Sequence, residues 1–217
     1  MSFSSKESTT FLNKLDKESI NKYRNYWKNL IPKTHLDYWK RWVFSFMSVH
    51  TTWKQNVKGY EAVVSLGMDF NRRQLRRRIE SSRVGLNRIR TEGILRMTKS
   101  FISDPRSWYP GENESFRDCR DRLMNETFGL GITKVSFVLE LLDSEKCDAV
   151  CLDTHLLQLY KLPRSTPNKT LYKDVENHWI DICKSRKIPS PLARHIFWDR
   201  KQGKSLNNYW AYVFEAA

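Results

Sequence analysis

Hydrophobic side chains recur at helical spacing through the aromatic-rich segment 19–47. In the second half of this segment, apolar residues three or four positions apart define one face of a helix. These residues are Leu36, Trp39, Val43, Phe46 and Met47. The segment Pro32-Lys33-Thr34 separates two helices, because proline and a threonine cap are typical of a helix boundary. We therefore expect one helix before Pro32 and a second that Thr34 caps.

The same spacing continues over most of the remaining chain. Further helices are expected at about 52–65, 85–97, 115–126, 132–142, from 153 onward, and at 171–184, 190–201 and 207–215. Thr51 or Thr52 is expected to cap the helix at 52–65. The sequence contains no internal repeat and no low-complexity tract. These patterns predict nine to eleven helices, little or no sheet, and an all-α fold.

The composition supports a packed core. Of 217 residues, 40% are hydrophobic and 13% aromatic, which excludes a disordered basic tail. Gly and Pro, at 8 and 7 residues, are scarce, which argues against a loop-rich all-β barrel. The length allows one large domain or two small lobes. Lys plus Arg number 38 against 24 Asp plus Glu, a net charge of +14, so a polyanion such as nucleic acid is the first partner to consider.

Positive charge is concentrated in residues 71–100, where nine Arg and one Lys stand against two Glu, a local charge of +8. The run includes Arg76, Arg77 and Arg78. A run of this kind is often only a solvated helix face, but its density favours a surface that contacts phosphates. On the helix that follows, the inward face is expected to carry Leu86, Ile89 or Arg90, Gly93 and Met97.

The four cysteines, at 119, 147, 151 and 183, are separated by 28, 4 and 32 residues and form no CxxC pair. These offsets fit neither a zinc site nor an iron–sulfur loop, so no metal ligands are assigned. Isolated thiols are typical of a reducing compartment, and the first residues lack the apolar core of a secretory signal. No stretch approaches the roughly 18 apolar residues of a membrane helix. We expect an intracellular protein, cytoplasmic or nuclear, that is neither secreted nor bound to a membrane.

The segment most informative about chemistry is a glycine turn that joins two helices. Gly129-Leu130-Gly131 lets the backbone approach a ligand closely, and the amide groups at the start of the next helix can bind a phosphate. Lys134 follows in the first turn of an apolar helix, where the helix dipole and desolvation both disfavour an ammonium ion. A lysine here indicates either a neutral amine nucleophile or a side chain that reaches the rim to bind phosphate. Asp153 lies at the expected N-cap of the next helix, as a cap or as a carboxylate that stabilises positive charge.

These residues resemble the signature of the helix-hairpin-helix DNA glycosylase superfamily. The match is Gly129-Leu130-Gly131-Ile132-Thr133-Lys134, then Val150-Cys151-Leu152-Asp153-Thr154-His155, with nineteen residues from Lys134 to Asp153. Segment 44–53 is similar to the helix–turn–helix that fills the gap left by an extruded base. Segment 84–94 is similar to the helix that enters the second half of that domain. The resemblance covers roughly residues 40–160 and is closest to the 8-oxoguanine DNA glycosylase/AP lyases.

The resemblance implies a two-lobed helical fold with three segments. These are an N-terminal helical extension (1–35), the glycosylase core (36–160, with the hairpin near 126–136) and C-terminal helices (161–217) that pack back on the N-terminal lobe. It implies a bifunctional glycosylase/lyase of DNA base-excision repair, with Lys134 as nucleophile and Asp153 as catalytic carboxylate. The expected partner is double-stranded DNA that contains a damaged or modified base, and the protein is expected to be a monomer.

The remaining site residues are expected from the resemblance together with the arginine run and the aromatic residues of the chain. The residues expected to contact DNA are Gly129, Gly131, Thr133, His50, Thr51, Arg76, Arg77 and Arg78. The residues expected to line the base pocket are Phe46, Trp53, His155, Phe197 and Trp198; each aromatic among them also fits the ordinary core. No cofactor is expected, because the four-cysteine cluster of the iron–sulfur members is missing, apart from a monovalent cation that the hairpin could hold.

The chain departs from the family pattern in two places. The hairpin has one residue more than usual between Gly131 and Lys134. The position that fills the gap left by the base carries neither the usual Gln nor Asn, which leaves His50 or Thr51 to do so. Two alternatives stay open: an enzyme of this fold, as in some phages, that modifies hypermodified thymine bases, and an inactive DNA-binding module. An oxidised purine such as 8-oxoguanine is the favoured substrate.

Overall fold

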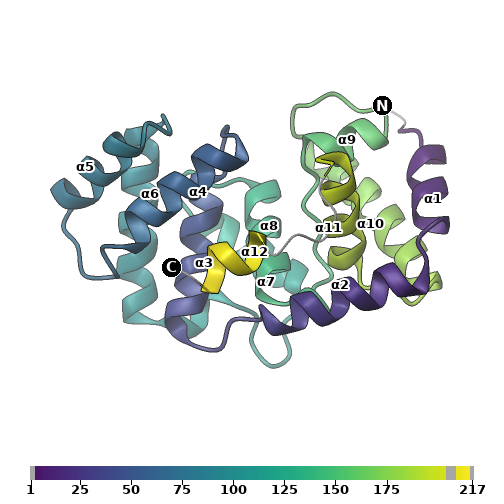
Figure 1. Cartoon of the computed structure of the whole chain (residues 1–217), viewed down its shortest axis with the longest axis horizontal. Coiled ribbons are helices and arrows are strands. Elements are labelled where there is room, and N and C mark those ends of the chain that lie inside the picture. Colours follow the sequence, from purple (N-terminus) through teal and green to yellow (C-terminus); the bar gives the residue numbers. More distant parts are fainter. Residues whose placement is uncertain (1–2, 204–208, 216–217) are drawn as a thin grey trace.

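The computed structural model describes residues 3–203 and 209–215, and these contain twelve α-helices, one 3-10 helix and no strand (Figure 1). The all-α prediction is confirmed, and the predicted number of helices was too low. The helices are α1 Lys6–Asn13, α2 Lys17–Asn29, α3 His35–Met47, α4 Trp53–Val64, α5 Arg72–Ser82, α6 Asn87–Ser103, η1 Pro105–Trp108, α7 Phe116–Glu126, α8 Ile132–Leu142, α9 Thr154–Leu159, α10 Lys169–Ser185, α11 Ser190–Lys201 and α12 Tyr209–Glu215.

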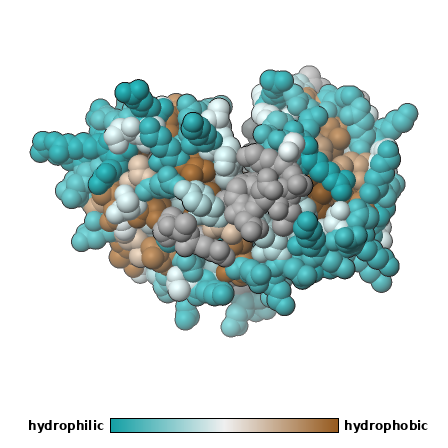
Figure 2. Space-filling model, viewed as in Figure 1, coloured by the Kyte–Doolittle hydropathy of each residue, from teal (hydrophilic) through white to brown (hydrophobic). Residues whose placement is uncertain are grey.

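The helices form two lobes (Figure 1). The first lobe contains α3 to α8, and the second contains α1, α2, α9, α10 and α11. The chain starts in the second lobe, builds the first, and returns through the loop between α8 and α9. Helix α12 then lies across the front of the junction. On the face that Figure 2 shows, many of the coloured residues are hydrophilic, and a notch separates the lobes at the top.

Side-chain caps fix where the central helices begin. The Thr34 hydroxyl accepts a hydrogen bond from the Asp37 amide, and the Asp37 carboxylate accepts one from the Thr34 amide, which completes a capping box. Thr52 and Gln55 form the same motif at the start of α4. Such a box satisfies amide groups that the first helical turn leaves without partners. The predicted break before Thr34 and the cap at Thr52 are both confirmed.

The helical spacing begins only at residue 19, so the pattern itself does not predict helix α1, which lies within the N-terminal extension (1–35) that the resemblance implies to be helical. Its N-cap Ser5 makes no side-chain hydrogen bond, so local signals for a helix are weak. Tertiary packing stabilises it instead: the Phe11 ring stacks on Trp179 at 6.2 Å and meets Phe197 edge-on at 5.1 Å. Such packing contributes more to helix stability in proteins than intrinsic propensity does.

The inward face of α6 resolves an alternative that the pattern left open. Arg90 is buried and only 2% exposed, whereas Ile89 is 40% exposed. Gly93 packs against α3 and the hairpin so closely that an added Cβ would lie 2.5 Å from the Phe46 ring and 2.6 Å from the Phe128 carbonyl oxygen. Glycine at this position therefore allows the hairpin backbone to lie directly on α6.

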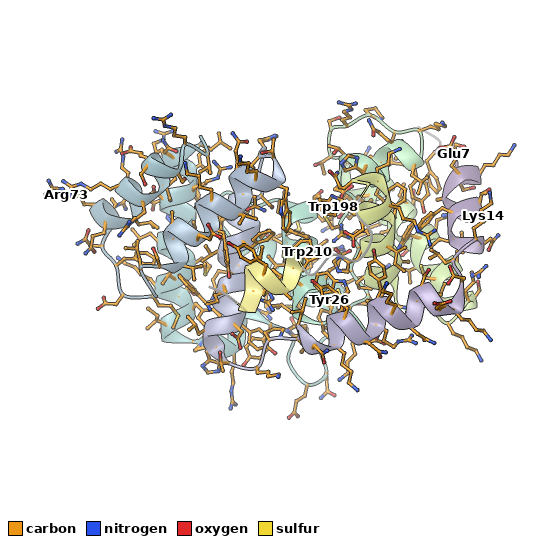
Figure 3. All side chains as sticks on the ribbon, in the orientation of Figure 1. Glu7, Lys14, Tyr26, Arg73, Trp198 and Trp210 are labelled. Atoms are coloured by element: carbon orange, nitrogen blue, oxygen red, sulfur yellow. The ribbon has the colours of Figure 1, made fainter. Side chains whose placement is uncertain are left out.

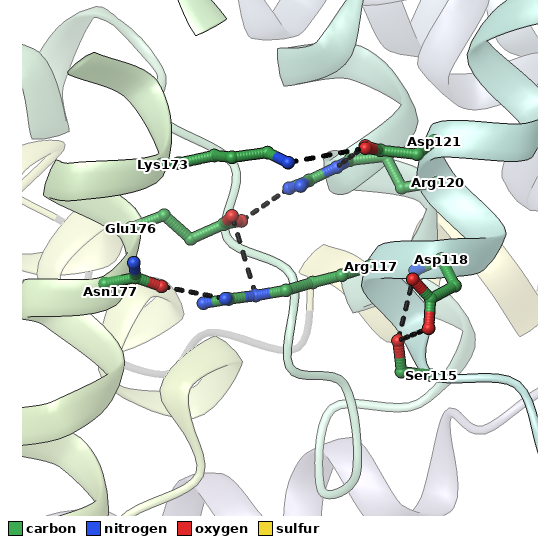
Figure 4. A pocket seen from close by; sticks show the side chains of 8 residues that line it. All are labelled: Ser115, Arg117, Asp118, Arg120, Asp121, Lys173, Glu176 and Asn177. Atoms are coloured by element: carbon green, nitrogen blue, oxygen red, sulfur yellow. Dashed lines mark hydrogen bonds and ion pairs between the residues drawn. The ribbon is translucent and has the colours of Figure 1, made fainter. Parts of the chain in front are cut away.

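A polar bridge between α7 and α10 joins the lobes behind the junction (Figure 4). The buried Arg120 pairs with the buried Glu176 at 2.5 Å, and Glu176 also accepts from the Val150 amide at 2.8 Å. A cavity of about 200 Å³ lies beside them, lined by charged side chains such as Arg117 and Asp121 that pair with their neighbours. The bridge is therefore a structural clamp, and it also holds the segment that leads to Asp153.

An aromatic cluster fills the front of the junction. Trp210 of α12 lies 5.3 Å from Trp27, 5.5 Å from Phe44 and 4.8 Å from Trp53, measured between ring centroids. These three rings come from both lobes, and Figure 3 shows Trp210 close to Trp198 and Tyr26 at the centre of the molecule. Burial of large rings is the main source of stabilisation at such contacts, so α12 acts as an apolar seal between the lobes.

Candidate active site

The glycine hairpin ends α7 and starts α8 as the sequence predicts. Gly129 has a φ of +87°, in the left-handed region that favours glycine. Gly131 is the N-cap of α8 and provides no side-chain acceptor. The Lys134 amide donates to the Gly131 carbonyl at 2.9 Å, so the amides of Ile132 and Thr133 are left for a ligand or solvent. The hairpin is fixed against α6, because the guanidinium of Arg96 lies 4.8 Å from the Phe128 ring centroid.

Lys134 lies in the first turn of α8, and its Nζ points toward the end of α3. Nζ donates to the Ser48 carbonyl oxygen at 3.0 Å and to Ser48 Oγ at 2.8 Å. Burial lowers the pKa of Lys134; the charge of Arg194 acts in the same direction and that of Asp153 opposes it. A neutral amine has two N–H groups and one lone pair. Because Ser48 can accept from both N–H groups, the lone pair is left available for attack.

Asp153 is the N-cap of α9, as predicted. Its Oδ1 accepts from the amides of His155 and Leu156, both at 2.9 Å. Its Oδ2 lies 3.4 Å from a guanidinium nitrogen of Arg194. The side chain is 21% exposed. One carboxylate oxygen is thus fixed by the helix start, while the other contacts Arg194 and the side chain stays partly exposed.

The two predicted catalytic residues come from different lobes and interact electrostatically. Helix α8, which carries Lys134, belongs to the first lobe, and helix α9, which Asp153 caps, belongs to the second (Figure 1); the Asp153 charge acts on the Lys134 amine. Phe137 of α8 lies near two cations: Lys134 Nζ is 5.4 Å from its ring centroid and the Arg194 guanidinium 5.5 Å. An amine of lowered pKa within electrostatic reach of a carboxylate matches the needs of nucleophilic catalysis on a carbon that becomes positively charged.

Sequence reasoning missed three residues of this site: Ser48, Glu140 and Arg194. Ser48 belongs to the segment 44–53, but it lies 86 residues from Lys134, so nothing local indicates their contact. Glu140 and Arg194 are fully buried and pair at 2.5 Å across 54 residues. Glu140 does carry a local signal, because a carboxylate in the apolar stretch 132–142 needs a buried partner. Nothing local identifies that partner.

The predicted DNA-contacting residues other than the arginines lie on the hairpin or on the α3–α4 turn. His50 is exposed with a φ of +50°, and Thr51 donates its hydroxyl to the Met47 carbonyl at 2.8 Å. Thr133 Oγ1 has no hydrogen-bond partner among the described residues. The α3–α4 turn also contains Ser48, which holds Lys134. The structure thus brings Gly131, Thr133 and this turn near the amine, and their contact with DNA stays a prediction.

The three predicted arginines of α5 lie away from this region. Helix α5 forms the outer end of the first lobe, where Arg73 is labelled in Figure 3. Arg76 is exposed and pairs with Glu80 at 2.7 Å. Arg77 and Arg78 are exposed, and the ion pairs of the described residues include neither. Their role in binding phosphates is a prediction, and the pairing makes Arg76 the weakest candidate of the three.

The five predicted base-pocket residues separate into two groups. Trp53 and Trp198 are partly buried and 5.8 Å apart across the junction. His155 follows Asp153 by two residues, and its Nε2 lies 3.1 Å from Gln202. By contrast, Phe46 is 1% exposed within the first lobe and Phe197 is 8% exposed in the second. Neither of these two rings presents a surface on which a base could stack, because both are covered by other side chains.

In the part of the chain that the structure describes, side chains form no cluster of metal ligands and no helix could span a membrane. No three His, Cys, Asp or Glu side chains there converge as metal ligands. No helix there is long and apolar enough to cross a membrane. All four cysteines are buried and unpaired by disulfides. The expectations of no iron–sulfur cluster and of a monovalent cation at the hairpin stay predictions.

Comparison with known proteins finds matches by structure alone. No family model and no curated protein matches the sequence. The 8-oxoguanine DNA glycosylase of Thermotoga maritima matches with a TM-score of 0.75 at 16% identity, over 92% of this chain and 98% of that one. The Methanocaldococcus jannaschii 8-oxoguanine glycosylase/lyase, in complex with 15mer DNA containing 8-oxoguanine, matches with a TM-score of 0.72 at 20% identity, over 93% and 98%. Another structure of the M. jannaschii 8-oxoguanine DNA glycosylase has a TM-score of 0.68 at 21% identity, over 88% and 87%. The chain therefore has the fold of these glycosylases, which confirms the fold predicted from the resemblance.

Proposed function

We propose that this protein is a DNA glycosylase with associated lyase activity that removes an oxidised purine, such as 8-oxoguanine, from duplex DNA. The observation that carries the proposal is the environment of Lys134. Its Nζ is held by two Ser48 oxygens at 2.8 and 3.0 Å, its pKa is lowered by burial, and Asp153 stands within electrostatic reach. A merely phosphate-binding lysine needs none of these features, because it functions as an exposed cation.

The reaction begins with extrusion of the damaged nucleotide, since a base inside the duplex cannot be reached. The lone pair of Lys134 Nζ attacks the anomeric carbon C1′. The bond between C1′ and the base nitrogen breaks, its electron pair leaves with the base, and the base takes up a proton. Asp153 stabilises the positive charge that develops on the sugar, with its Oδ1 held by the start of α9.

The lyase step follows from the same covalent adduct. Loss of the Nζ proton and opening of the sugar ring give a Schiff base between Lys134 and C1′. Loss of a C2′ proton then expels the 3′ phosphate by β-elimination, which breaks the strand. Water hydrolyses the Schiff base and regenerates the free amine. Each step uses groups of the substrate, water and this amine, so no redox partner is needed.

Charge and the hairpin support binding to the DNA backbone. The net charge of +14 provides attraction that does not depend on sequence. The first-turn amides of α8, beside the N-cap Gly131, suit a phosphate oxygen. One of the structurally similar glycosylases is in complex with DNA containing 8-oxoguanine, which supports the same class of partner for this chain.

The test is borohydride trapping over a panel of duplexes that each contain one oxidised or deaminated base. We expect wild-type protein to form a covalent adduct with an oxidised purine duplex and Lys134→Gln to form none. Asp153→Asn should bind the duplex but lose most base release. Thr166→Ala, a change at an exposed position of the α9–α10 loop, serves as the control and should trap as wild type does.

Three outcomes would contradict the proposal. No adduct with any member of the panel would refute the lyase activity. Base release without an adduct would leave a glycosylase that lacks the lysine chemistry. Binding to duplexes without base release would instead support modification of an intact base or an inactive binding module.

A further inference from the structure

Two buried arginine–glutamate pairs hold the segment that leads to Asp153. Glu140 Oε1 accepts from the Cys151 amide at 2.9 Å, and Glu176 Oε1 accepts from the Val150 amide at 2.8 Å. Each glutamate is fully buried and pairs with a buried arginine at 2.5 Å. A buried backbone amide must find an acceptor, so both pairs fix the path of this segment. Only one of them also reaches the Asp153 carboxylate among the described contacts.

That pair is Glu140 with Arg194. Arg194 Nε donates to Glu140 Oε2 at 2.5 Å, while another nitrogen of the same guanidinium lies 3.4 Å from Asp153 Oδ2. Because a guanidinium is planar with its donors in a fixed fork, its orientation toward one carboxylate determines its orientation toward the other. Glu140 therefore controls how Arg194 approaches Asp153.

We infer that Arg194 is a positioning residue of the proposed reaction: held by Glu140, it orients Asp153 Oδ2 within electrostatic reach of Lys134 without neutralising it. The inference rests on the proposed function. Burial raises the pKa of Glu140 to about 7, against the charge of Arg194, so Glu140 provides the charge that Arg194 needs once pH exceeds that value. Asp153 thus keeps its own negative charge for the sugar, while contact with Arg194 restricts the rotation of its carboxylate.

The other ionisable groups near Arg194 agree with this division of charge. Burial lowers the pKa of its neighbour His195, so the ring is neutral and does not compete for Glu140. Burial likewise raises the pKa of the Cys151 thiol, which stays protonated. Lys134 also lies near Asp153, and the Arg194 charge lowers the Lys134 pKa. The site therefore combines a fixed cation, Arg194, with an amine that can be neutral.

Double-mutant cycles test the inference with single-turnover base release on the duplex that wild type processes. Glu140→Gln keeps an acceptor for the Cys151 amide but releases Arg194 to pair with Asp153. We expect it to slow base release by about 10- to 100-fold, the size found for residues that orient a reacting ligand in metal sites. In an Asp153→Asn background, Glu140→Gln should slow base release by less than about 3-fold, because the Asp153 carboxylate through which Glu140 acts is absent. Arg194→Gln should show the same dependence.

The matched control is Arg120→Gln, which breaks the equivalent buried pair with Glu176 but has no contact with the Asp153 carboxylate among the described hydrogen bonds. Its effect on stability should resemble that of Arg194→Gln, and its effect on rate should be the same with Asp153 or Asn at position 153. If Arg194→Gln does not fold, the rates of the isosteric Glu140→Gln variant with Asp and with Asn at position 153 provide the test. Rate losses that are equal in both backgrounds, or no loss at all, overturn the inference.

A second measurement needs no turnover and so separates this inference from the proposed function. Reductive methylation of Lys134 by formaldehyde and borohydride reports its neutral fraction as pH is varied. Arg194→Gln should shift the pH midpoint of Lys134 methylation upward, because the Arg194 cation is lost and Asp153 is free to pair with Lys134. Glu140→Gln should shift it downward. Shifts in the same direction, or none, overturn the positioning role even if the lesion panel reveals no substrate; failure of the panel alone refutes only the proposed function.

Discussion

Replacing Arg90 by methionine tests how this fold accommodates a buried cation. The ion pairs of the described residues do not include Arg90, and burial lowers its pKa. Its guanidinium instead donates to backbone carbonyls at the end of α3 and after α5. These belong to Phe46 at 3.2 Å, Val84 at 2.6 Å, Met47 at 3.4 Å, and also Gly85 and Val49. Two of the five flank Ser48, so Arg90 also stabilises the turn that holds Lys134.

The magnitude follows from these carbonyls. A hydrogen bond to a charged group contributes about 1.5–3 kcal/mol net, and a buried polar group left unsatisfied costs about 1–3 kcal/mol. Five such terms cannot simply be added, because the turn relaxes and the desolvation cost of the guanidinium disappears as well. Changes that break a buried polar network cost about 3–5 kcal/mol. We therefore expect Arg90→Met to lower the free energy of unfolding by about 3–4 kcal/mol, and Tm by roughly 10 °C.

Urea and thermal unfolding followed by circular dichroism measure both quantities. The control is Arg77→Met, which removes an exposed arginine from the same basic segment and should change stability by less than about 0.5 kcal/mol. If Arg90→Met lies within about 1 kcal/mol of this control, the carbonyl contacts do not stabilise the turn and the reasoning fails.

Three further changes should give measurable effects. Burial lowers the pKa of Lys134 below its ordinary value of 10.5, and only the neutral amine reacts. The rate of base release should therefore rise with pH and level off below pH 10.5. A midpoint at or above that value contradicts the assignment of Lys134 as the nucleophile. The double variant Arg77→Glu/Arg78→Glu should weaken binding to duplexes of every sequence and reduce the slope of log Kd against log salt by about 2. An unchanged slope would mean that both residues only form a solvated helix face. Gly93→Ala should destabilise the protein by about 1–3 kcal/mol in urea unfolding, since the added methyl would lie 2.5 Å from the Phe46 ring; wild-type stability would mean that α3 and the hairpin shift freely.

What the sequence predicts well here depends on local interactions. Thr34 and Thr52 cap their helices through residues only three positions away, so their chemistry is visible in the sequence. Lys134 in the first turn of α8 and Asp153 at the N-cap of α9 occupy positions that neighbouring residues also define. Together these positions define the hairpin and the two candidate catalytic groups without any knowledge of tertiary structure.

What the sequence does not predict depends on contacts between distant segments. Ile89 and Arg90 fit the helical spacing almost equally, and hydrophobicity favours the wrong one. Arg90 is the buried residue because it reaches carbonyls of a turn more than 40 residues away. Arg194 likewise contacts Asp153 from a helix outside the family resemblance. In the sequence of a basic protein, a charged residue that is buried because it contacts distant partners cannot be distinguished from an exposed one.

The position of α12 in the chain has a consequence for biosynthesis. Its Trp210 contacts Trp27 of one lobe and Phe44 of the other, and α12 follows every other helix in the sequence. Domains fold as their chains emerge from the ribosome, N-terminal parts first. The basic α5 and the hairpin are therefore made long before the residue that seals the junction. A nascent chain would carry this basic surface, the proposed site of DNA attraction, before the helices that complete the candidate active site have been made.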